Sequence, residues 1–258
     1  MAQTFYKYQG TGNDFIVLDN RSSIFDKNNA KQVARLCHRR FGIGADGLIL
    51  LEKHHDLDFS MVYFNADGNA SSMCGNGGRC IVAFANYLGI IGGSTSFMAI
   101  DGVHRAKIDS RGMVELQMQD VNVIQDFETH LFLDTGSPHH VQMVQDIATL
   151  NVKTKGAAIR YGQLYEESGC NVNFVENTDS GFQVRTYERG VEDETFSCGT
   201  GVTAVALAMH YSGRSDNTSI VCKTKGGDLE VRFEYDGLSY TNIWLIGPAQ
   251  QVFKGELP

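Results

Sequence analysis

The chain has 258 residues, with 28 glycines, 3 prolines and a hydrophobic fraction of 42%, a composition typical of one or two globular domains and not of a disordered or fibrous chain. Its net charge of −8, together with the lack of a Lys/Arg-rich run, argues against a nucleic-acid partner, because neutralising several phosphates requires a basic face. Every apolar run is far shorter than the roughly 20 residues of a membrane helix, so we expect no membrane partner.

In chain order, the first half is rich in short β-like stretches between Gly, Asp and Asn breaks. The expected strands are 14–19, 47–52, 57–64, 96–100, 104–109 and 113–118. The range 28–40 has the apolar spacing of a surface helix, whereas 78–88 is apolar nearly all round and predicts a buried helix.

The second half repeats this plan, with a buried helix at 202–211. Its expected strands are 130–133, 140–144, 171–175, 182–188, 219–223, 228–235 and 238–245. We therefore predict an α+β fold of two pseudo-symmetric domains, each a mostly antiparallel sheet wrapped around a central apolar helix. The N-terminal domain would span 1–120 with 249–258, and the C-terminal domain 121–248.

Each half also carries the same cysteine-glycine turn directly before its buried helix. The two turns are Met73-Cys74-Gly75-Asn76-Gly77 and Ser197-Cys198-Gly199-Thr200-Gly201. The cysteines are 124 residues apart, and the same offset carries Gly12 onto Gly136, Gly47 onto Asn171 and Asn65 onto Arg189. One fixed offset across most of the chain indicates an internal duplication.

A helix N-terminus stabilises a thiolate over a thiol, and its unpaired amides can hold a carboxylate. If the halves face each other, a carboxylate held by both helix ends would have its α-carbon between the sulfurs of Cys74 and Cys198. One thiolate could then remove a proton while the opposite thiol delivers another, which is the chemistry of a racemase. The other four cysteines, which we expect to be packing residues, are Cys37, Cys80, Cys170 and Cys222.

Other sites are disfavoured by the spacing of their residues. The chain has no CxxC pair, so we expect no zinc and no other metal. The range 42–47 matches GxGxxG but precedes a predicted strand, whereas a dinucleotide fingerprint follows one and opens a helix. The N-terminal residues lack a basic segment followed by an apolar one, which favours a cytoplasmic protein with reduced thiols.

Together the motifs resemble those of the diaminopimelate epimerase family along most of the chain. The matching segments are Gly10-Thr11-Gly12-Asn13-Asp14-Phe15, Phe64-Asn65-Ala66-Asp67-Gly68, Met73 to Arg79, Tyr187-Glu188-Arg189-Gly190, Glu194-Thr195 and Ser197 to Gly201. The resemblance implies epimerisation of LL-diaminopimelate to the meso form, in lysine and peptidoglycan-precursor synthesis, without a cofactor. We also expect a homodimer.

The resemblance implies that Cys74 and Cys198 are the catalytic bases. The reacting carboxylate would be held by the amides of Gly75, Asn76, Gly199 and Thr200. The distal amino-acid head would be bound by Asn13, Asn65 and Asn171, with Arg189 on its carboxylate and Glu188 facing its ammonium. Ser137 and His139 complete the candidate substrate site.

Two positions depart from the family pattern. Ser137 stands where many members have Asn, and Gly47 where some have Gln. Without the resemblance, Asn13 and Asn65 are equally well explained as turn residues, and Arg189 as a solvated ion-pair residue. Two other functions stay open: a racemase of another amino acid, such as proline, hydroxyproline or histidine, and a thiol-disulfide redox protein.

Overall fold

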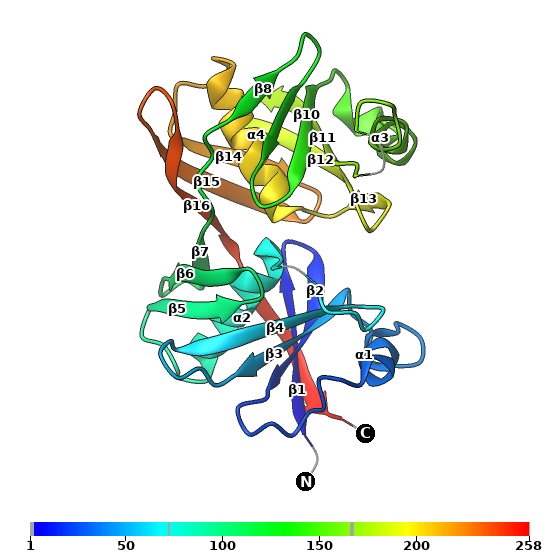
Figure 1. The fold of residues 1–258 in the computed structure, drawn as a ribbon, viewed down its shortest axis with the longest axis vertical. Coiled ribbons are helices and arrows are strands. Elements are labelled where there is room, and N and C mark those ends of the chain that lie inside the picture. The colour runs from blue at the N-terminus through cyan, green and yellow to red at the C-terminus, as the bar shows by residue number, and fades with distance from the viewer. Residues whose placement is uncertain (1–2, 72, 166–167, 258) are drawn as a thin grey trace. The chain divides into compact units, whose positions relative to one another are not determined.

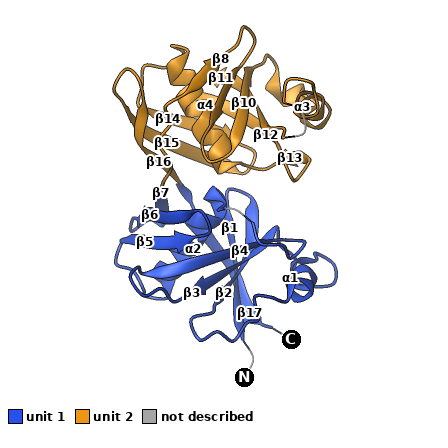
Figure 2. Cartoon of the chain, viewed as in Figure 1, with its two compact units in different colours: residues 1–116, 247–258 blue, residues 117–246 orange. Residues whose placement is uncertain are grey.

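A computed structural model of the protein describes residues 3–71, 73–165 and 168–257. Residues 1 and 2, part of the N-terminal segment considered above, lie outside the described residues. The chain divides into two compact units (Figure 2): unit 1 spans Met1–Leu116 and Gly247–Pro258, and unit 2 spans Gln117–Ile246.

Among its described residues, unit 1 has eight paired strands, which come from both ends of the chain. They are β1 (Thr4–Gly10), β2 (Asn13–Asp19), β3 (Gly47–Glu52), β4 (Phe59–Asn65), β5 (Ser94–Ala99), β6 (Gly102–Ile108), β7 (Met113–Gln117) and β17 (Gln250–Glu256). The pairing runs β17-β1-β2-β3-β4-β5-β6-β7. The pairs β2–β3 and β4–β5 are parallel, and the others are antiparallel.

Unit 2 repeats the strand pairing of unit 1. Its strands are β8 (Ile124–Asp126), β9 (Leu131–Asp134), β10 (Pro138–Met143), β11 (Asn171–Thr178), β12 (Gly181–Glu188), β13 (Asp193–Thr195), β14 (Ser219–Thr224), β15 (Gly227–Tyr235) and β16 (Tyr240–Pro248). The pairing runs β8-β9-β10-β11-β12-β14-β15-β16, and β10–β11 and β12–β14 are its parallel pairs. Strand β13 adds an antiparallel pair to β12. The matching order of parallel and antiparallel pairs shows the internal duplication in the topology.

One long helix occupies the middle of each unit: α2 (Gly75–Tyr87) in unit 1 and α4 (Gly199–Tyr211) in unit 2. Helix α2 packs against β1, β2, β3 and β6, and α4 against β10, β11, β14 and β15, as the ribbon in Figure 1 shows. Both are buried on nearly all sides because most of their residues are apolar. The predicted α+β class, with a mostly antiparallel sheet around a central apolar helix in each half, is confirmed.

The smaller elements lie between the strands. Helix α1 (Ala30–Cys37) joins β2 to β3, and α3 (Val152–Arg160), preceded by the short 3₁₀ helix η1 (Ile147–Thr149), joins β10 to β11. Asn29 and Asn151 cap α1 and α3 by accepting a hydrogen bond from the amide three residues on. Strands β1 and β17 and helix α3 were not among the predicted elements.

Two details of the predicted repeat differ in the structure. Helices α2 and α4 each begin three residues earlier than expected, because the glycine-rich turn is itself the first helical turn. The offset of 124 residues also does not relate β3–β4 to β11–β12 along both strands, because the two pairs differ in register by one residue. Leu48 lies opposite Phe64, but Val172, 124 residues after Leu48, lies opposite Tyr187. In strand register, Asn65 therefore corresponds to Glu188 and not to Arg189.

In the part of the chain that the structure describes, none of the helices combines the length and apolar character needed to cross a membrane.

Candidate active site

In unit 1, Cys74 is the N-cap residue of α2. Its backbone is extended, with φ −103° and ψ 125°, and its side chain makes no capping hydrogen bond to the first-turn amides. Gly75, Asn76 and Gly77 form the buried first turn. The amides of a first helical turn have no partner within the helix and carry the positive end of its dipole. This turn can therefore bind an anion next to the sulfur.

Asn13, at the start of β2, lies beside this thiol. The Cys74 Sγ is 3.6 Å from Asn13 Oδ1, and Asn76 Nδ2 donates to the same oxygen at 3.5 Å. Asn13 Nδ2 donates to Asp46 Oδ2 at 2.6 Å. Since a carboxylate only accepts hydrogen bonds, Asp46 fixes the amide so that its oxygen faces Cys74.

Asp46 belongs to a charged cluster at the start of β2 and β3. Arg39 bridges Asp14 at 2.7 Å and Asp46 at 2.6 Å, and Lys7 pairs with Asp14 at 2.6 Å. Burial raises the pKa of Asp14, but the hydrogen bonds and charges of Arg39 and Lys7 outweigh this effect and lower it to about 2. Asp14 is thus ionised at neutral pH, and its ion pair with Arg39 helps to place Asp46, which holds Asn13.

The remaining predicted residues of unit 1 lie where β3 and β4 meet. Gly47 is opposite Asn65 in the ladder, and the Asn65 side chain is exposed. A Cβ at Gly47 would lie 2.5 Å from both Phe64 O and Tyr63 Cε2. Glycine is therefore required here because the Tyr63 ring, which also contacts Phe15 edge-on at 5.9 Å, fills the space of a side chain at position 47.

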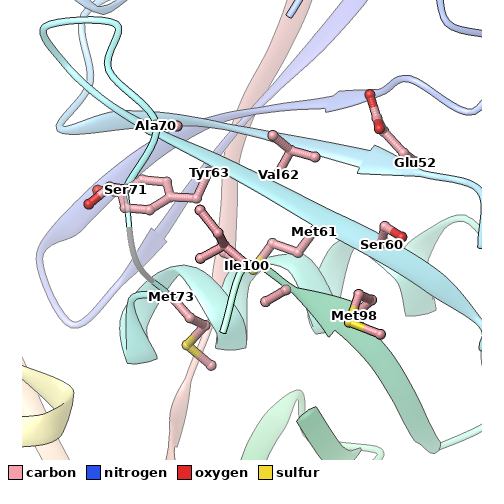
Figure 3. Close-up of a pocket in the computed structure, with 11 residues that line it drawn as sticks. Glu52, Ser60, Met61, Val62, Tyr63, Ala70, Ser71, Met73, Met98 and Ile100 are labelled. Atoms are coloured by element: carbon pink, nitrogen blue, oxygen red, sulfur yellow. The ribbon is translucent and has the colours of Figure 1, made fainter. Parts of the chain in front are cut away.

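A mostly apolar pocket of about 300 Å³ lies along β4, and Tyr63 is one of the residues that line it (Figure 3). Met61, Met98 and Ile100 line it together with Met73, the residue before Cys74. None of the predicted site residues lines this pocket.

In unit 2, Cys198 is the N-cap residue of α4, again extended, with φ −126° and ψ 115° and no capping hydrogen bond. Its Sγ is 3.4 Å from Thr200 Oγ1. The turn is anchored by Thr135, the residue after the end of β9, whose hydroxyl donates to Thr200 O at 2.9 Å. Unit 2 therefore presents a second thiol at a second helix N-terminus.

Sequence reasoning missed Asn173, a residue of β11 whose side chain packs against this turn at Gly201. Its Nδ2 donates to His139 Nδ1 at 3.1 Å and to His140 O at 3.0 Å, and its Oδ1 accepts from Thr186 at 2.9 Å. A Cβ at Gly201 would lie 2.4 Å from this Oδ1. The signal was present in the sequence, because Asn171 and Asn173 share one face of a strand.

His139 is fully buried. Burial, with a smaller contribution from the Arg189 charge, lowers its pKa to about 3, so the ring is neutral. Because Asn173 donates to Nδ1, the proton lies on Nε2. That buried Nε2–H has no hydrogen-bond partner among the described residues, so it is available to an acceptor from a ligand.

Asn171 is hydrogen-bonded to two other predicted residues of unit 2, Ser137 and Arg189. Its Nδ2 donates to Ser137 Oγ at 2.9 Å and to Pro138 O at 3.2 Å, and its Oδ1 accepts from the Arg189 amide at 2.9 Å. The Arg189 side chain is exposed, and its Nη1 donates to Ser168 O at 3.0 Å. Glu188, the last residue of β12, is half-buried.

The four remaining cysteines are buried within the two units. Burial raises the pKa of Cys37, Cys80, Cys170 and Cys222 to about 12, so each is a neutral thiol at pH 7. Within the described ranges, no group of three or more His, Cys, Asp or Glu side chains is arranged to hold a metal ion.

Comparison with known proteins identifies the family. The model of the diaminopimelate epimerase family matches residues 5–124 and 131–252. The chain belongs to this family. A diaminopimelate epimerase of Flavobacterium psychrophilum is 54% identical over 250 residues, covering 96% of this chain and 98% of the relative. One of Chlorobaculum tepidum is 42% identical over 258 residues, with coverages of 96% and 98%.

More distant solved structures share the fold of the diaminopimelate epimerase family. A Bacillus anthracis phenazine biosynthesis protein of the PhzF family matches with a TM-score of 0.80 at 12% identity, covering 100% of this chain and 99% of the other. A hydroxyproline epimerase from Agrobacterium vitis matches with a TM-score of 0.69 at 15% identity, covering 99% and 92%. At these identities the likeness shows the fold alone.

Proposed function

We propose that this protein is a pyridoxal-phosphate-independent epimerase that converts LL-2,6-diaminopimelate to meso-diaminopimelate. The observation that carries the proposal is found in both units: Cys74 and Cys198 are each the N-cap residue of a buried helix, and neither side chain makes a capping hydrogen bond. Membership of the diaminopimelate epimerase family supports the substrate.

In the proposed mechanism, the reacting α-carboxylate binds the first-turn amides of Gly75 and Asn76 and of Gly199 and Thr200. These amides also stabilise the negative charge that develops on the α-carbon and its carboxylate. One cysteine, as thiolate, takes the α-proton, and the C–H electron pair remains on the substrate. The other, as thiol, donates its proton to the opposite face of that carbon. The donor ends the turnover as a thiolate, and proton exchange between the two sulfurs and water restores the starting state.

The distal amino-acid head would be recognised by the polar groups described above. Asn65, Asn171 and Ser137 supply neutral hydrogen bonds, while Arg189 binds the distal carboxylate and Glu188 the ammonium, a charge pair that distinguishes the distal stereocentre. The Asn13 contact with Cys74 at 3.6 Å favours a role at the reacting end as well.

The unpartnered His139 Nε2–H is a donor suited to a substrate oxygen. Since the ring stays neutral down to a pH of about 3, His139 would act as a hydrogen-bond donor and not as a second acid or base.

The wider setting of this activity is also a proposal. The product is a precursor of lysine and of peptidoglycan, so we infer that the protein works in the cytoplasm, where thiols stay reduced. We also propose a homodimer, which the exposed apolar residues Val252 and Phe253 on β17 would help to form. Light scattering of the purified protein tests the assembly, with a mass of about 28 kDa contradicting it.

A substrate panel tests the activity. The reduced enzyme is incubated with LL-diaminopimelate, L-proline, trans-4-hydroxy-L-proline and L-histidine, and the products are separated by chiral chromatography. We expect meso-diaminopimelate to form without added cofactor, and no comparable turnover of the others. Turnover of an imino acid in preference to diaminopimelate would contradict the proposed substrate, and the lack of any substrate-dependent proton exchange would favour a redox function.

A further inference from the structure

The glycine-rich range 42–47 forms a turn that places Asp46 directly before β3. The turn folds back on the C-terminal end of α1, because the amides of Ile43 and Gly44 both donate to Leu36 O, at 2.9 and 3.0 Å. Gly44 has φ +82°, a backbone conformation that glycine adopts without strain. The GxGxxG spacing therefore has a structural explanation here, which is the placement of Asp46.

Both carboxylate oxygens of Asp46 accept hydrogen bonds. Oδ1 accepts from Arg39 Nη2 at 2.6 Å, and Oδ2 accepts from the Asp14 amide at 3.2 Å and from Asn13 Nδ2 at 2.6 Å. The Asp46 amide in turn donates to Asp14 O at 2.9 Å. The carboxylate is thus fixed by Arg39 and Asp14, and it sets the position of Asn13 Nδ2.

These contacts of Asp46 are exposed to solvent. The Asp46 side chain is 41% exposed, and that of its ion-pair partner Arg39 is 58% exposed. Ion pairs of this exposure contribute little to stability, because water screens them. The main effect of the carboxylate is therefore on the orientation of Asn13 and not on the stability of the fold.

An asparagine amide donates hydrogen bonds on one side and accepts them on the other. With its Nδ2 on Asp46, Asn13 turns its Oδ1 to the start of α2, where Cys74 Sγ lies at 3.6 Å and Asn76 Nδ2 at 3.5 Å. The reversed amide would set the Asn13 oxygen against the carboxylate oxygen of Asp46, which is repulsive. Cys74 therefore lies beside a fixed acceptor, which favours a thiol in the empty enzyme and a cationic donor in a complex.

Unit 2 offers a direct comparison, because the parallel pairs β2–β3 and β10–β11 are related by the offset of 124 residues without a shift in register. At that offset Asn13 corresponds to Ser137, and Asp46 to Cys170. Cys170 is a fully buried, neutral thiol, and the hydroxyl of Ser137 can rotate to donate or accept. The carboxylate that fixes the neighbouring polar side chain in unit 1 is thus replaced by an uncharged residue in unit 2.

We propose that Asp46 is a positioning residue that fixes Asn13 as a hydrogen-bond acceptor beside Cys74, where the Asn13 oxygen receives the ammonium group on the reacting carbon of the substrate. The substrate part of this inference rests on the proposed function, in which the carboxylate of an amino acid binds the first turn of α2. With carboxylate and ammonium bound by separate groups, the reacting carbon has a defined orientation to the sulfur. The orientation of Asn13 itself can be measured in the empty enzyme.

The first test is alkylation of the empty, reduced enzyme by iodoacetamide between pH 5 and pH 10, with each cysteine followed by peptide mass spectrometry. The thiolate is the reactive form, so the pH midpoint reports the group that faces each sulfur. In Asp46→Asn, Arg39 attracts the oxygen of the new amide, whose NH2 group then faces Asn13 and reverses it. The NH2 group of Asn13 now donates to the sulfur. We expect the Cys74 midpoint to fall by roughly one pH unit and the Cys198 midpoint to stay unchanged.

Two controls separate orientation from charge. Asp14→Asn removes one negative charge from the same cluster, but Asp14 makes no side-chain contact with the Asn13 amide among the hydrogen bonds of the described residues. It should therefore shift the Cys74 midpoint much less than Asp46→Asn. In an Asn13→Ala background, Asp46→Asn should have no further effect, because Asp46 acts through Asn13.

The other titratable groups that interact with this cluster or with Cys74 are the same in all of these variants. They are Lys7, Arg39, Arg79 and Cys80. An unchanged Cys74 midpoint in Asp46→Asn, equal shifts in the two aspartate variants, or the same shift in the Asn13→Ala background would overturn the proposal. Asp46→Ala also releases the Asn13 amide and should lower the midpoint, so the test does not depend on one variant.

The second test is turnover of LL-diaminopimelate. Asp46→Asn should lower kcat/KM by roughly ten- to a hundredfold, the effect of losing a hydrogen bond to a charged group, with an unchanged melting temperature. Equal values of kcat/KM in the variant and the wild type would overturn the ammonium contact. A wild-type enzyme that does not turn over LL-diaminopimelate would contradict the proposed function instead, while the alkylation midpoints would still test the orientation of Asn13.

Discussion

Gly77 and Gly201 occupy the same place in the two cysteine turns, 124 residues apart, but we expect opposite consequences when each is replaced by alanine. A Cβ at Gly201 would lie 2.4 Å from the Oδ1 of Asn173, whose side chain is fully buried and holds His139. A Cβ at Gly77 would lie 3.2 Å from Ile49 Cδ1 and 3.4 Å from Met61 Cε, both ends of flexible side chains.

The expected changes in the free energy of unfolding follow from this difference in packing. Alanine is favoured over glycine in a helix by up to about 1 kcal/mol, and both variants have this gain. Overpacking a rigid site costs about 1–3 kcal/mol, and a displaced buried amide loses hydrogen bonds of about 1 kcal/mol each. Gly201→Ala should therefore be less stable than the wild type by about 1–3 kcal/mol. Gly77→Ala should be within about 1 kcal/mol of it.

Urea unfolding followed by circular dichroism measures both changes, and the single tryptophan, Trp244, reports on unit 2 alone. Epimerase activity of Gly201→Ala should fall as well, because Asn173 no longer holds His139 in place. The reasoning would be refuted if the two variants had equal free energies of unfolding with unchanged m-values.

Three further predictions concern catalysis and pH. Replacing Cys74 or Cys198 by Ala should lower kcat by more than about a thousandfold with an unchanged melting temperature, since neighbouring groups cannot supply the lost acid or base; near-normal turnover would exclude a two-base mechanism. Arg189→Ala should lower kcat/KM for diaminopimelate by roughly ten- to a hundredfold, the effect of losing a hydrogen bond to a charged group, and equal specificity constants would remove Arg189 from the site. Asp14 has a folded-state pKa of about 2, below its ordinary 3.8, so its ion pairs stabilise the fold above pH 4 and this stabilisation is lost as the pH falls towards 2. Asp14→Asn should accordingly melt at a lower temperature than the wild type at pH 6, with a difference that narrows below pH 4; a constant difference would mean that the charge is not responsible.

Much of the fold follows from local patterns. The ranges 78–88 and 202–211 are apolar nearly all round, and this pattern predicts the central helices because a helix without a broad polar face must be buried. Their first turns were not predicted as helix, since glycine has a low helix propensity. The tight packing around Gly77 and Gly201 compensates for that cost.

The missed elements depend on distant partners. Strand β17 is exposed along nearly its whole length and is ordered by pairing with β1, from the other end of the chain. Helix α3 buries only Val152 and Gly156, too few residues for a recognisable apolar stripe. Strand β1 contains Lys7, whose burial depends on its ion pair with Asp14. Each of these contacts is invisible to a short sequence window.

The candidate site also combines features that the sequence predicts with features that depend on the fold. The cysteine turns are recognisable because residue type, glycine spacing and repetition coincide. The hydrogen bonds around these turns are not recognisable in the sequence. Asn173 donates to His139, and Arg79 of α2 donates to Thr11, and the fold alone brings these residues together.

The fate of the α-proton in heavy water tests the two-base mechanism most directly. The reduced enzyme is incubated with LL-diaminopimelate in deuterium oxide, and substrate and product are analysed separately by mass spectrometry at low conversion. If opposite thiols remove and deliver the proton, meso-diaminopimelate should carry deuterium at the inverted carbon from the earliest turnovers, while the remaining LL substrate stays largely protiated. Appreciable protium at the inverted carbon of the product would show that one group returns the same proton, and would contradict the mechanism.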